Sequence, residues 1–230
     1  HVRTHTMRRI VYVVGARANF MKIAPLMDAV RAGGRLQQVL VNTGQHYDEN
    51  MAGGFFTELG MPRPDTDLGV GSGTHAVQTG KVMMGFEEVC LRERPDLVVV
   101  VGDVNSTMAA AIVAAKLVIP VAHVEAGLRS YDHTMPEEVN RLIADRLSNL
   151  LFTPSADADA NLAKEGVPED RIHLVGNIMI DTLHRHLPLA RLDRVRDRIP
   201  VSAGQYAVLT LHRPSNVDDL DILRGILDAV

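Results

Sequence analysis

The chain has 230 residues, 46% of them hydrophobic, with four Tyr, five Phe, no Trp and a formal net charge of −4 at pH 7. This composition excludes a disordered chain, and the absence of a basic surplus argues against nucleic acid as a partner. No apolar run reaches the roughly 18 to 20 residues that a membrane span requires, and residues 1–6 lack the apolar core of a signal peptide.

Strands and helices are predicted to alternate, because runs rich in Val and Ile are separated by longer stretches of helical periodicity. The predicted strands are 8–15, 36–44, 96–103, 120–127, 150–155 and 172–177, and the predicted helices are 20–32, 47–59, 74–94, 106–117, 136–149, 156–165 and 181–198. Thr74 and Ser106 are expected as N-caps and Pro136 as a first helical residue. The alternation predicts an α/β fold with a doubly wound parallel sheet.

The pattern changes after Gly176, where an Arg- and Asp-rich helix leads to a further predicted strand at 206–211 and an amphipathic segment. One β-α unit cannot bury its own apolar faces, so we expect either a fragment or a second domain completed elsewhere. The predicted domains are a tag or upstream remnant at 1–6, an N-terminal Rossmann-like domain at 7–177, and a connecting helix with the first β-α unit of an incomplete C-terminal domain at 178–230.

The single cysteine, Cys90, lies in a helical pattern and has no CxxC or Cys/His spacing around it. A disulfide framework and a structural zinc site are therefore not predicted, and a reducing, cytoplasmic location fits best. His173, His184 and His186 fall in or beside predicted regular elements and form no ligand pattern with carboxylates. We expect no metal ion and no cofactor.

Two cations follow the first predicted strand, at the edge of an open parallel sheet where the ligand crevice lies. Arg17 comes two residues after Gly15, and Lys22 lies near the start of the helix, where cations beside a helix N-terminus attract anions. The turn matches neither GxGxxG nor GxxxxGK[ST], so a dinucleotide fingerprint and a P-loop are both absent. A glycine turn with two surface cations is an equally good interpretation.

Carboxylates lie at the ends of the strands predicted at 96–103 and 120–127. In VVVVGDVNST, a ligand role for Asp103 is favoured over a capping role because Ser106 is available as the cap. In HVEAGLRS, alternation predicts that His123 and Glu125 lie on the same side of the strand. An ion pair between Glu125 and Arg129 is the structural alternative, but the neighbouring carboxylates favour a site.

The segment MPEEVNRLIADRL adds a third carboxylate. Its i, i+4 spacing predicts Glu137 and Arg141 on one helix face, with Glu138 turned away from them. Glu138 is equally well interpreted as an acidic residue that stabilises the helix N-terminus. His212 directly follows the strand predicted at 206–211, where a lone histidine is commonly only a surface residue.

Seven ordered motifs now point to one family. GARANFMKIAPL, NTGQHYDENM, VGDVNST, HVEAGLRS, MPEEVNR, VGNIMIDTL and TLHRPSN resemble the motifs of the non-hydrolysing UDP-N-acetylglucosamine 2-epimerases. The resemblance implies one Rossmann-like half of a GT-B-like two-domain fold that binds a UDP-sugar between its domains. It also implies interconversion of UDP-N-acetylglucosamine and UDP-N-acetylmannosamine without NAD, through elimination of UDP to a glycal and its re-addition.

The matching motifs also imply site residues. The expected catalytic residues are Asp103, Glu125, Glu137 and His212, and the expected substrate-binding residues are Arg17, Lys22 and Arg141. The three carboxylates would act as acid and base, with their individual roles open, and His212 would approach the diphosphate. We expect a UDP-sugar as ligand, no nucleic acid or membrane partner, and a homodimer.

Other functions stay open. A hydrolysing 2-epimerase is disfavoured because its first loop resembles GTRADYGK, and a dehydrogenase because the glycine fingerprint is missing. A non-catalytic nucleotide-sugar-binding module or an inactive paralogue is the alternative from a different class, and a GT-B glycosyltransferase fits on fold alone. With most of the second domain absent, we expect the chain alone to bind a UDP-sugar weakly.

Overall fold

The computed structural model describes residues 7–45, 60, 63–190, 199, 202, 204–211 and 214–230. The chain divides into two units, His1–Leu187 and Pro188–Val230. The first unit carries the sheet and most of the candidate site. The predicted helix at 47–59 and the candidate residue His212 lie outside the described residues.

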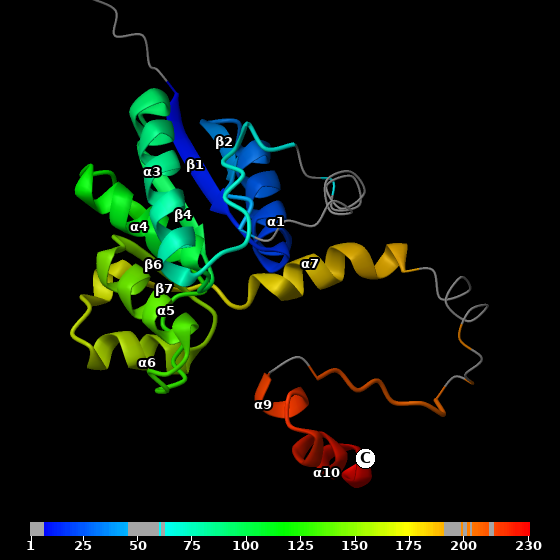
Figure 1. Cartoon of the computed structure of the whole chain (residues 1–230). Helices are drawn as coiled ribbons and strands as arrows, with labels where there is room; N and C mark the ends of the chain where they lie inside the picture. The colour runs from blue at the N-terminus through cyan, green and yellow to red at the C-terminus, as the bar shows by residue number, and fades with distance from the viewer. Residues whose placement is uncertain are drawn as a thin grey trace, which may run out of the picture. The chain divides into compact units, whose positions relative to one another are not determined.

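Parallel strands form a seven-stranded sheet in the order β3-β2-β1-β4-β5-β6-β7 (Figure 1). They are β1 (Arg8–Val14), β2 (Leu36–Asn42), β3 (Thr66–Asp67), β4 (Leu97–Val101), β5 (Val121–Val124), β6 (Leu150–Thr153) and β7 (Ile172–Leu174). The order reverses between β1 and β4, which is the topological switch point of a doubly wound sheet. The predicted fold class is confirmed.

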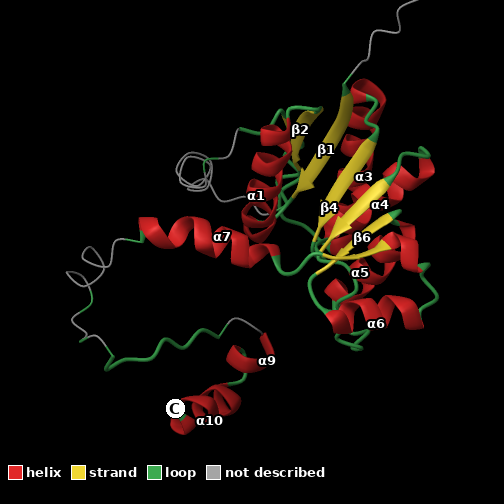
Figure 2. Cartoon of the chain, turned by 180° about the vertical axis from the view of Figure 1, so that it is seen from behind, coloured by secondary structure: helices red, strands yellow, loops and turns green. Residues whose placement is uncertain are grey.

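Helices cover both faces of the sheet (Figure 2). In the first unit they are α1 (Arg17–Gly33), α3 (His75–Glu93), α4 (Asn105–Lys116), α5 (Pro136–Leu147), α6 (Ala156–Lys164) and α7 (Ile178–His186), with short 3₁₀ turns η2 (Glu169–Arg171) and, across the unit boundary, η3 (Leu187–Leu189). The second unit contains α9 (Pro214–Val217) and α10 (Leu220–Ala229). The helix predicted at 181–198 begins earlier, where the Asn177 side chain caps it, and α7 ends shortly before Pro188.

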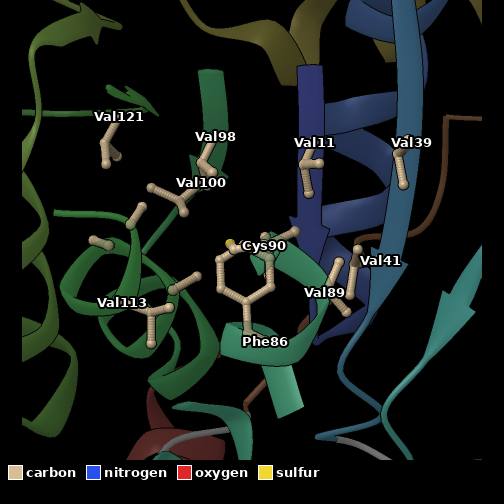
Figure 3. Packing of buried hydrophobic residues seen from close by; sticks show 14 of the residues in the cluster. Val11, Val39, Val41, Phe86, Val89, Cys90, Val98, Val100, Val113 and Val121 are labelled. Atoms are coloured by element: carbon tan, nitrogen blue, oxygen red, sulfur yellow. The ribbon is translucent and has the colours of Figure 1, made fainter. Parts of the chain in front are cut away.

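The core has two layers because successive strand residues point to opposite faces of the sheet. On one face, Phe86 and Cys90 of α3 pack against Val11, Val98 and Val100, and α4 completes this cluster (Figure 3). On the other face, residues of α1 pack against alternate positions of the same strands, among them Ile10, Tyr12, Val14, Val99 and Val101. Burial on both faces fixes the strands, and with them the turns that follow their carboxyl ends.

Two local predictions are confirmed and two are wrong. Thr74 caps α3 by accepting from the Val77 N–H, and Pro136 begins α5. Ser106 is not an N-cap, because α4 already begins at Asn105 and the Ser106 hydroxyl bonds elsewhere. The predicted strand at 206–211 is described without strand structure, since ladder hydrogen bonds need a neighbouring strand and the described residues of the second unit offer none.

Candidate active site

Two left-handed turns end the strands β4 and β5 side by side. Gly102 has φ 67° and Glu125 has φ 72°, a conformation that costs a non-glycine residue roughly 1–2 kcal/mol. The Gly102 N–H donates to the carbonyl of Val124 at 3.1 Å, which ties the turns together. The left-handed residue breaks the alternation of the strand, so the prediction that His123 and Glu125 share a side is wrong: His123 contacts Asp145 and Glu125 contacts Lys22.

Lys22 of α1 and Glu125 form an ion pair whose side chains are only 13% and 17% exposed. A Cβ atom placed on Gly102 would lie 3.5 Å from the Lys22 Nζ and 3.6 Å from the Glu125 Oε2. These are ordinary van der Waals distances, so the pair lies directly beside the turn that carries Asp103. The alternative pair between Glu125 and Arg129 does not form.

Asp103 and Arg141 form a second pair, with the Asp103 side chain 36% exposed and that of Arg141 14% exposed. The Asn140 side chain also donates to the backbone carbonyl of Asp103 at 2.8 Å. Helix α5 thus contacts both the side chain and the backbone carbonyl of Asp103. The structure brings together four of the predicted site residues as two pairs, one beside Gly102 and one formed by the residue that follows it: Lys22, Glu125, Asp103 and Arg141.

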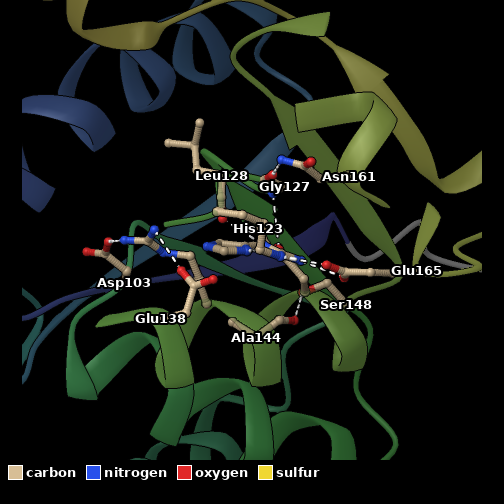
Figure 4. Close-up of polar contacts among 12 residues, drawn as sticks. Asp103, His123, Gly127, Leu128, Glu138, Ala144, Ser148, Asn161 and Glu165 are labelled. Carbon is tan, nitrogen blue, oxygen red and sulfur yellow. Dashed lines mark hydrogen bonds and ion pairs between the residues drawn. The ribbon is translucent and has the colours of Figure 1, made fainter. Parts of the chain in front are cut away.

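The two adjacent glutamates of α5 occupy opposite environments. Glu138 is 1% exposed and accepts hydrogen bonds from the Ser130 N–H at 2.9 Å, the Ser130 hydroxyl at 2.9 Å and the Tyr131 N–H at 3.0 Å. It also pairs with Arg141 at 3.1 Å (Figure 4). Burial would raise the pKa of Glu138, but these donors and the guanidinium lower it.

Glu137 is exposed, and its side chain has no hydrogen bond or ion pair with any residue that the structure describes. The prediction that Glu138 turns away from Arg141 is therefore wrong, since Glu138 is its partner and Glu137 points outward. The reason is the register of α5, whose buried positions Glu138, Asn140, Ala144 and Asp145 face the body of the protein. Sequence spacing fixed their relative angles but not which face was inward.

A network of charged side chains, which includes His123 and Glu165 (Figure 4), reaches the turn at Gly102 through the ring of His123. Asp145 accepts from Arg129 at 2.7 Å and from the Gly127 N–H at 3.1 Å, and lies 2.6 Å from the ring of His123. Arg129 also pairs with Glu165 at 2.7 Å. Burial would lower the pKa of His123 and raise that of Asp145, but their mutual attraction reverses both directions, with Arg129 adding to the effect on Asp145.

A neutral network lies at the carboxyl ends of β1 and β2. The Asn19 Oδ1 accepts from the Gly15 and Ala16 N–H groups at 3.1 and 3.0 Å. The Ser106 hydroxyl donates to Gln45 Oε1 at 2.7 Å and contacts the Thr43 hydroxyl at 2.8 Å. Gly15 is required by this packing, because a Cβ there would lie 2.3 Å from the Ser106 Oγ.

Two predicted site residues remain, Arg17 and His212. Arg17 is the first residue of α1 and is exposed, whereas His212 lies outside the described residues. Sequence reasoning missed Asp145, Glu165 and Gln45, whose partners are far away along the chain. Among the described residues, no group of His, Cys, Asp or Glu is arranged to hold a metal ion, and no described helix is long and apolar enough to cross a membrane.

Comparison with known proteins decides the family. The family model described as UDP-N-acetylglucosamine 2-epimerase matches residues 28–230. The chain belongs to the UDP-N-acetylglucosamine 2-epimerase family. This match confirms the predicted resemblance to the UDP-N-acetylglucosamine 2-epimerases.

The relatives that this chain matches are longer than it is. A UDP-N-acetylglucosamine 2-epimerase homolog of Methanococcus maripaludis is 44% identical over 96% of this chain and 62% of its own length. A UDP-2,3-diacetamido-2,3-dideoxy-D-glucuronate 2-epimerase of Pseudomonas aeruginosa is 40% identical over 96% of this chain and 62% of its own. The chain therefore spans about three fifths of these relatives.

A solved structure of the family extends the comparison. The epimerase of Methanocaldococcus jannaschii, in complex with UDP-N-acetylglucosamine and UDP, matches with a TM-score of 0.86 and 43% identity. The match covers 96% of this chain and 61% of that protein. It confirms the predicted Rossmann-like half of a GT-B-like epimerase fold.

Proposed function

We propose that this chain carries the proton-transfer groups of an enzyme that inverts C2 of UDP-N-acetylglucosamine without hydrolysing it. One observation carries the proposal: the pair Lys22–Glu125 lies beside Gly102 and the next residue, Asp103, pairs with Arg141, at the carboxyl edge of the sheet near its switch point. Each pair places a carboxylate beside a cation. An elimination that removes a proton and releases a diphosphate needs that combination.

The proposed reaction consists of an elimination and its reversal on the other face. A base takes the proton from C2, the C1–O bond breaks, and its electron pair leaves with UDP, so that a C1–C2 double bond forms. An acid then delivers a proton to C2 from the opposite face, and a UDP oxygen bonds C1 again. Two proton-transfer groups are therefore needed, one for each face of C2, and a carboxyl group is able to act as either an acid or a base.

Exposure separates the carboxylates that are able to meet a ligand from those that hold the structure. Asp103 and Glu125 are partly exposed, and Glu137 is exposed, so these three keep the proposed acid and base roles. Glu138 is excluded from a role on the substrate because four contacts already occupy its oxygens. The proposed diphosphate contacts are Arg17, Lys22, Arg141 and His212.

A homodimer is proposed as well. Val77, Met84 and Leu91 recur every seven residues along one face of α3 and are 48%, 66% and 61% exposed. An apolar stripe of this kind supports contact with a second copy of the chain. Sedimentation equilibrium of the wild type and of Met84→Lys tests it, since the substitution should lower the average mass; an unchanged monomeric mass for the wild type would remove the proposal.

The reaction is tested with the complete gene product, because the chain covers only part of its relatives' length. UDP-N-acetylglucosamine is incubated in D₂O, and the sugar products are followed by proton NMR. We expect UDP-N-acetylmannosamine with deuterium at C2. Release of free N-acetylmannosamine would indicate a hydrolysing enzyme, and UDP binding without turnover would indicate a binding module.

Substrate and site variants complete this test. A parallel incubation with UDP-2,3-diacetamido-2,3-dideoxy-D-glucuronate decides between the sugars in the names of the relatives, because similar sequence identities do not separate them. Asp103→Asn should abolish deuterium uptake at C2. Asp170→Asn, an exposed acid in η2 on the β7 side of the sheet, is the matched control and should leave it unchanged.

A further inference from the structure

His123 is fully buried and both of its ring nitrogens face hydrogen-bond acceptors. Nδ1 lies 2.6 Å from Oδ1 of Asp145, and Nε2 lies 2.8 Å from the carbonyl oxygen of Gly102. A neutral imidazole has one N–H and satisfies only one acceptor as a donor. A carbonyl never donates a hydrogen bond, so Nε2 must carry a hydrogen.

Asp145 decides the state of the other nitrogen. Its Oδ2 accepts from the Arg129 guanidinium at 2.7 Å and from the Gly127 N–H at 3.1 Å. Two donors on one oxygen, one of them cationic, stabilise the ionised carboxylate. An ionised carboxylate is only an acceptor, so Nδ1 also carries a hydrogen and the ring is an imidazolium.

Charged side chains surround the ring. His123 faces Asp145 from α5 and lies near Glu125 of its own segment. Arg129 pairs with Asp145 and with Glu165, and of these side chains only that of Glu165 is substantially exposed, at 37%. An imidazolium at His123 is therefore paired with a buried carboxylate and is not an isolated charge in the interior.

The ring holds the turn that carries Asp103. The Gly102 carbonyl accepts from His123, and the Gly102 N–H donates to Val124 at 3.1 Å, so both polar groups of the left-handed glycine are fixed. We infer that His123 is a positively charged positioning residue, whose two N–H groups link Asp145 to Gly102 and thereby fix Asp103 beside the Lys22–Glu125 pair. This inference rests on the proposed function for its catalytic part, and its charge state is independent of that function.

Nitrogen-15 NMR of histidine-labelled wild-type chain tests the charge state without any activity. At pH 7.5, about one unit above the ordinary histidine pKa of about 6.5, both ring nitrogens of His123 should show attached hydrogens. Free histidine in the same buffer, which is mostly neutral at this pH, serves as the reference. A nitrogen without hydrogen on His123 would overturn the inference.

Kinetics of the complete gene product test the positioning role. His123→Gln retains a donor but no positive charge, and we expect kcat to fall about 100-fold, as for a displaced catalytic group, with KM nearly unchanged. His184→Gln, at an exposed residue of α7, is the control and should have the same kcat and KM as the wild type. An unchanged kcat in folded His123→Gln would overturn the role. A wild type without epimerase activity would instead refute the proposed function, and the NMR result would still decide the charge of His123.

Discussion

The hydroxyl of Thr182 in α7 donates a hydrogen bond of 2.6 Å to the backbone carbonyl of Met21 in α1. In a regular helix this carbonyl would accept from the N–H of residue 25, but that residue is Pro25, which has none. A side chain 161 positions away thus replaces the missing helical hydrogen bond. The bond holds α7 against the helix that carries Lys22.

This compensation predicts coupling between Thr182 and Pro25. Thr182→Val keeps the shape but leaves the Met21 carbonyl unsatisfied, which should lower the free energy of unfolding by about 1–3 kcal/mol. In a Pro25→Ala background the helix supplies its own N–H, so the same change should cost clearly less. Urea unfolding of the four proteins measures this coupling, and Thr182→Ser is the control that keeps the hydroxyl. Equal losses in both backgrounds would contradict the compensation.

Substitution by glutamine should lower the stability of the protein at Glu138 but leave it nearly unchanged at Glu137. Glu138→Gln removes a buried anion from two N–H groups, a hydroxyl and Arg141, so the free energy of unfolding should fall by about 3 kcal/mol. Glu137→Gln, on an exposed residue, should change stability by less than about 0.5 kcal/mol while lowering epimerase activity. Thermal unfolding and the C2 exchange assay check the two properties; a strongly destabilised Glu137→Gln would contradict the assignment.

Two glycines provide a matched test of packing at the first turn. Gly15→Ala would place a Cβ 2.3 Å from the Ser106 Oγ and 2.6 Å from the Thr43 Oγ1, and such overpacking typically costs about 1–3 kcal/mol. Gly80→Ala in α3 meets nothing within 4 Å and should gain up to about 1 kcal/mol from helix propensity. Urea unfolding measures both. A neutral Gly15→Ala would show that the Thr43–Ser106 contact is not close-packed.

The His123–Asp145 pair should make stability depend on pH in a defined direction. The pKa of His123 is raised in the folded state, so its contribution is complete below the unfolded pKa of about 6.5 and is lost as pH rises through the folded pKa. The pKa of Asp145 is lowered, so its contribution is present above about 3.9 and is lost as pH falls through its folded pKa.

Urea unfolding of the wild type and His123→Gln across pH 6 to 9, on either side of the ordinary histidine pKa of about 6.5, checks the first of these signs. The stability difference between the two proteins should shrink as pH rises, because only the wild type loses its imidazolium. The contributions of the other titrating groups are nearly the same in the two proteins, so they largely cancel in the stability difference. A difference that stays constant or grows would contradict a raised pKa for His123.

The sequence by itself determined the parts of this protein that depend on local pattern. Val- and Ile-rich runs specify strands, the order of strands and helices specifies a doubly wound sheet, and strand ends specify where polar side chains gather. Asp103, Glu125, Lys22 and Arg141 were therefore found from their places after strands or on neighbouring helices, and the structure brings them together. The domain limits and the roles of these residues stay predictions.

Only the tertiary structure decided which charges pair and which are buried. Periodicity placed His123 and Glu125 on one side, but a left-handed residue turned Glu125 to Lys22. Periodicity also gave the angle between Glu137 and Glu138 on the helix, without showing which of the two side chains faced inward. The partners of His123 and Arg129 lie 22 and 36 residues away, and contacts between distant segments form only when packing brings their backbones together, which no local pattern records.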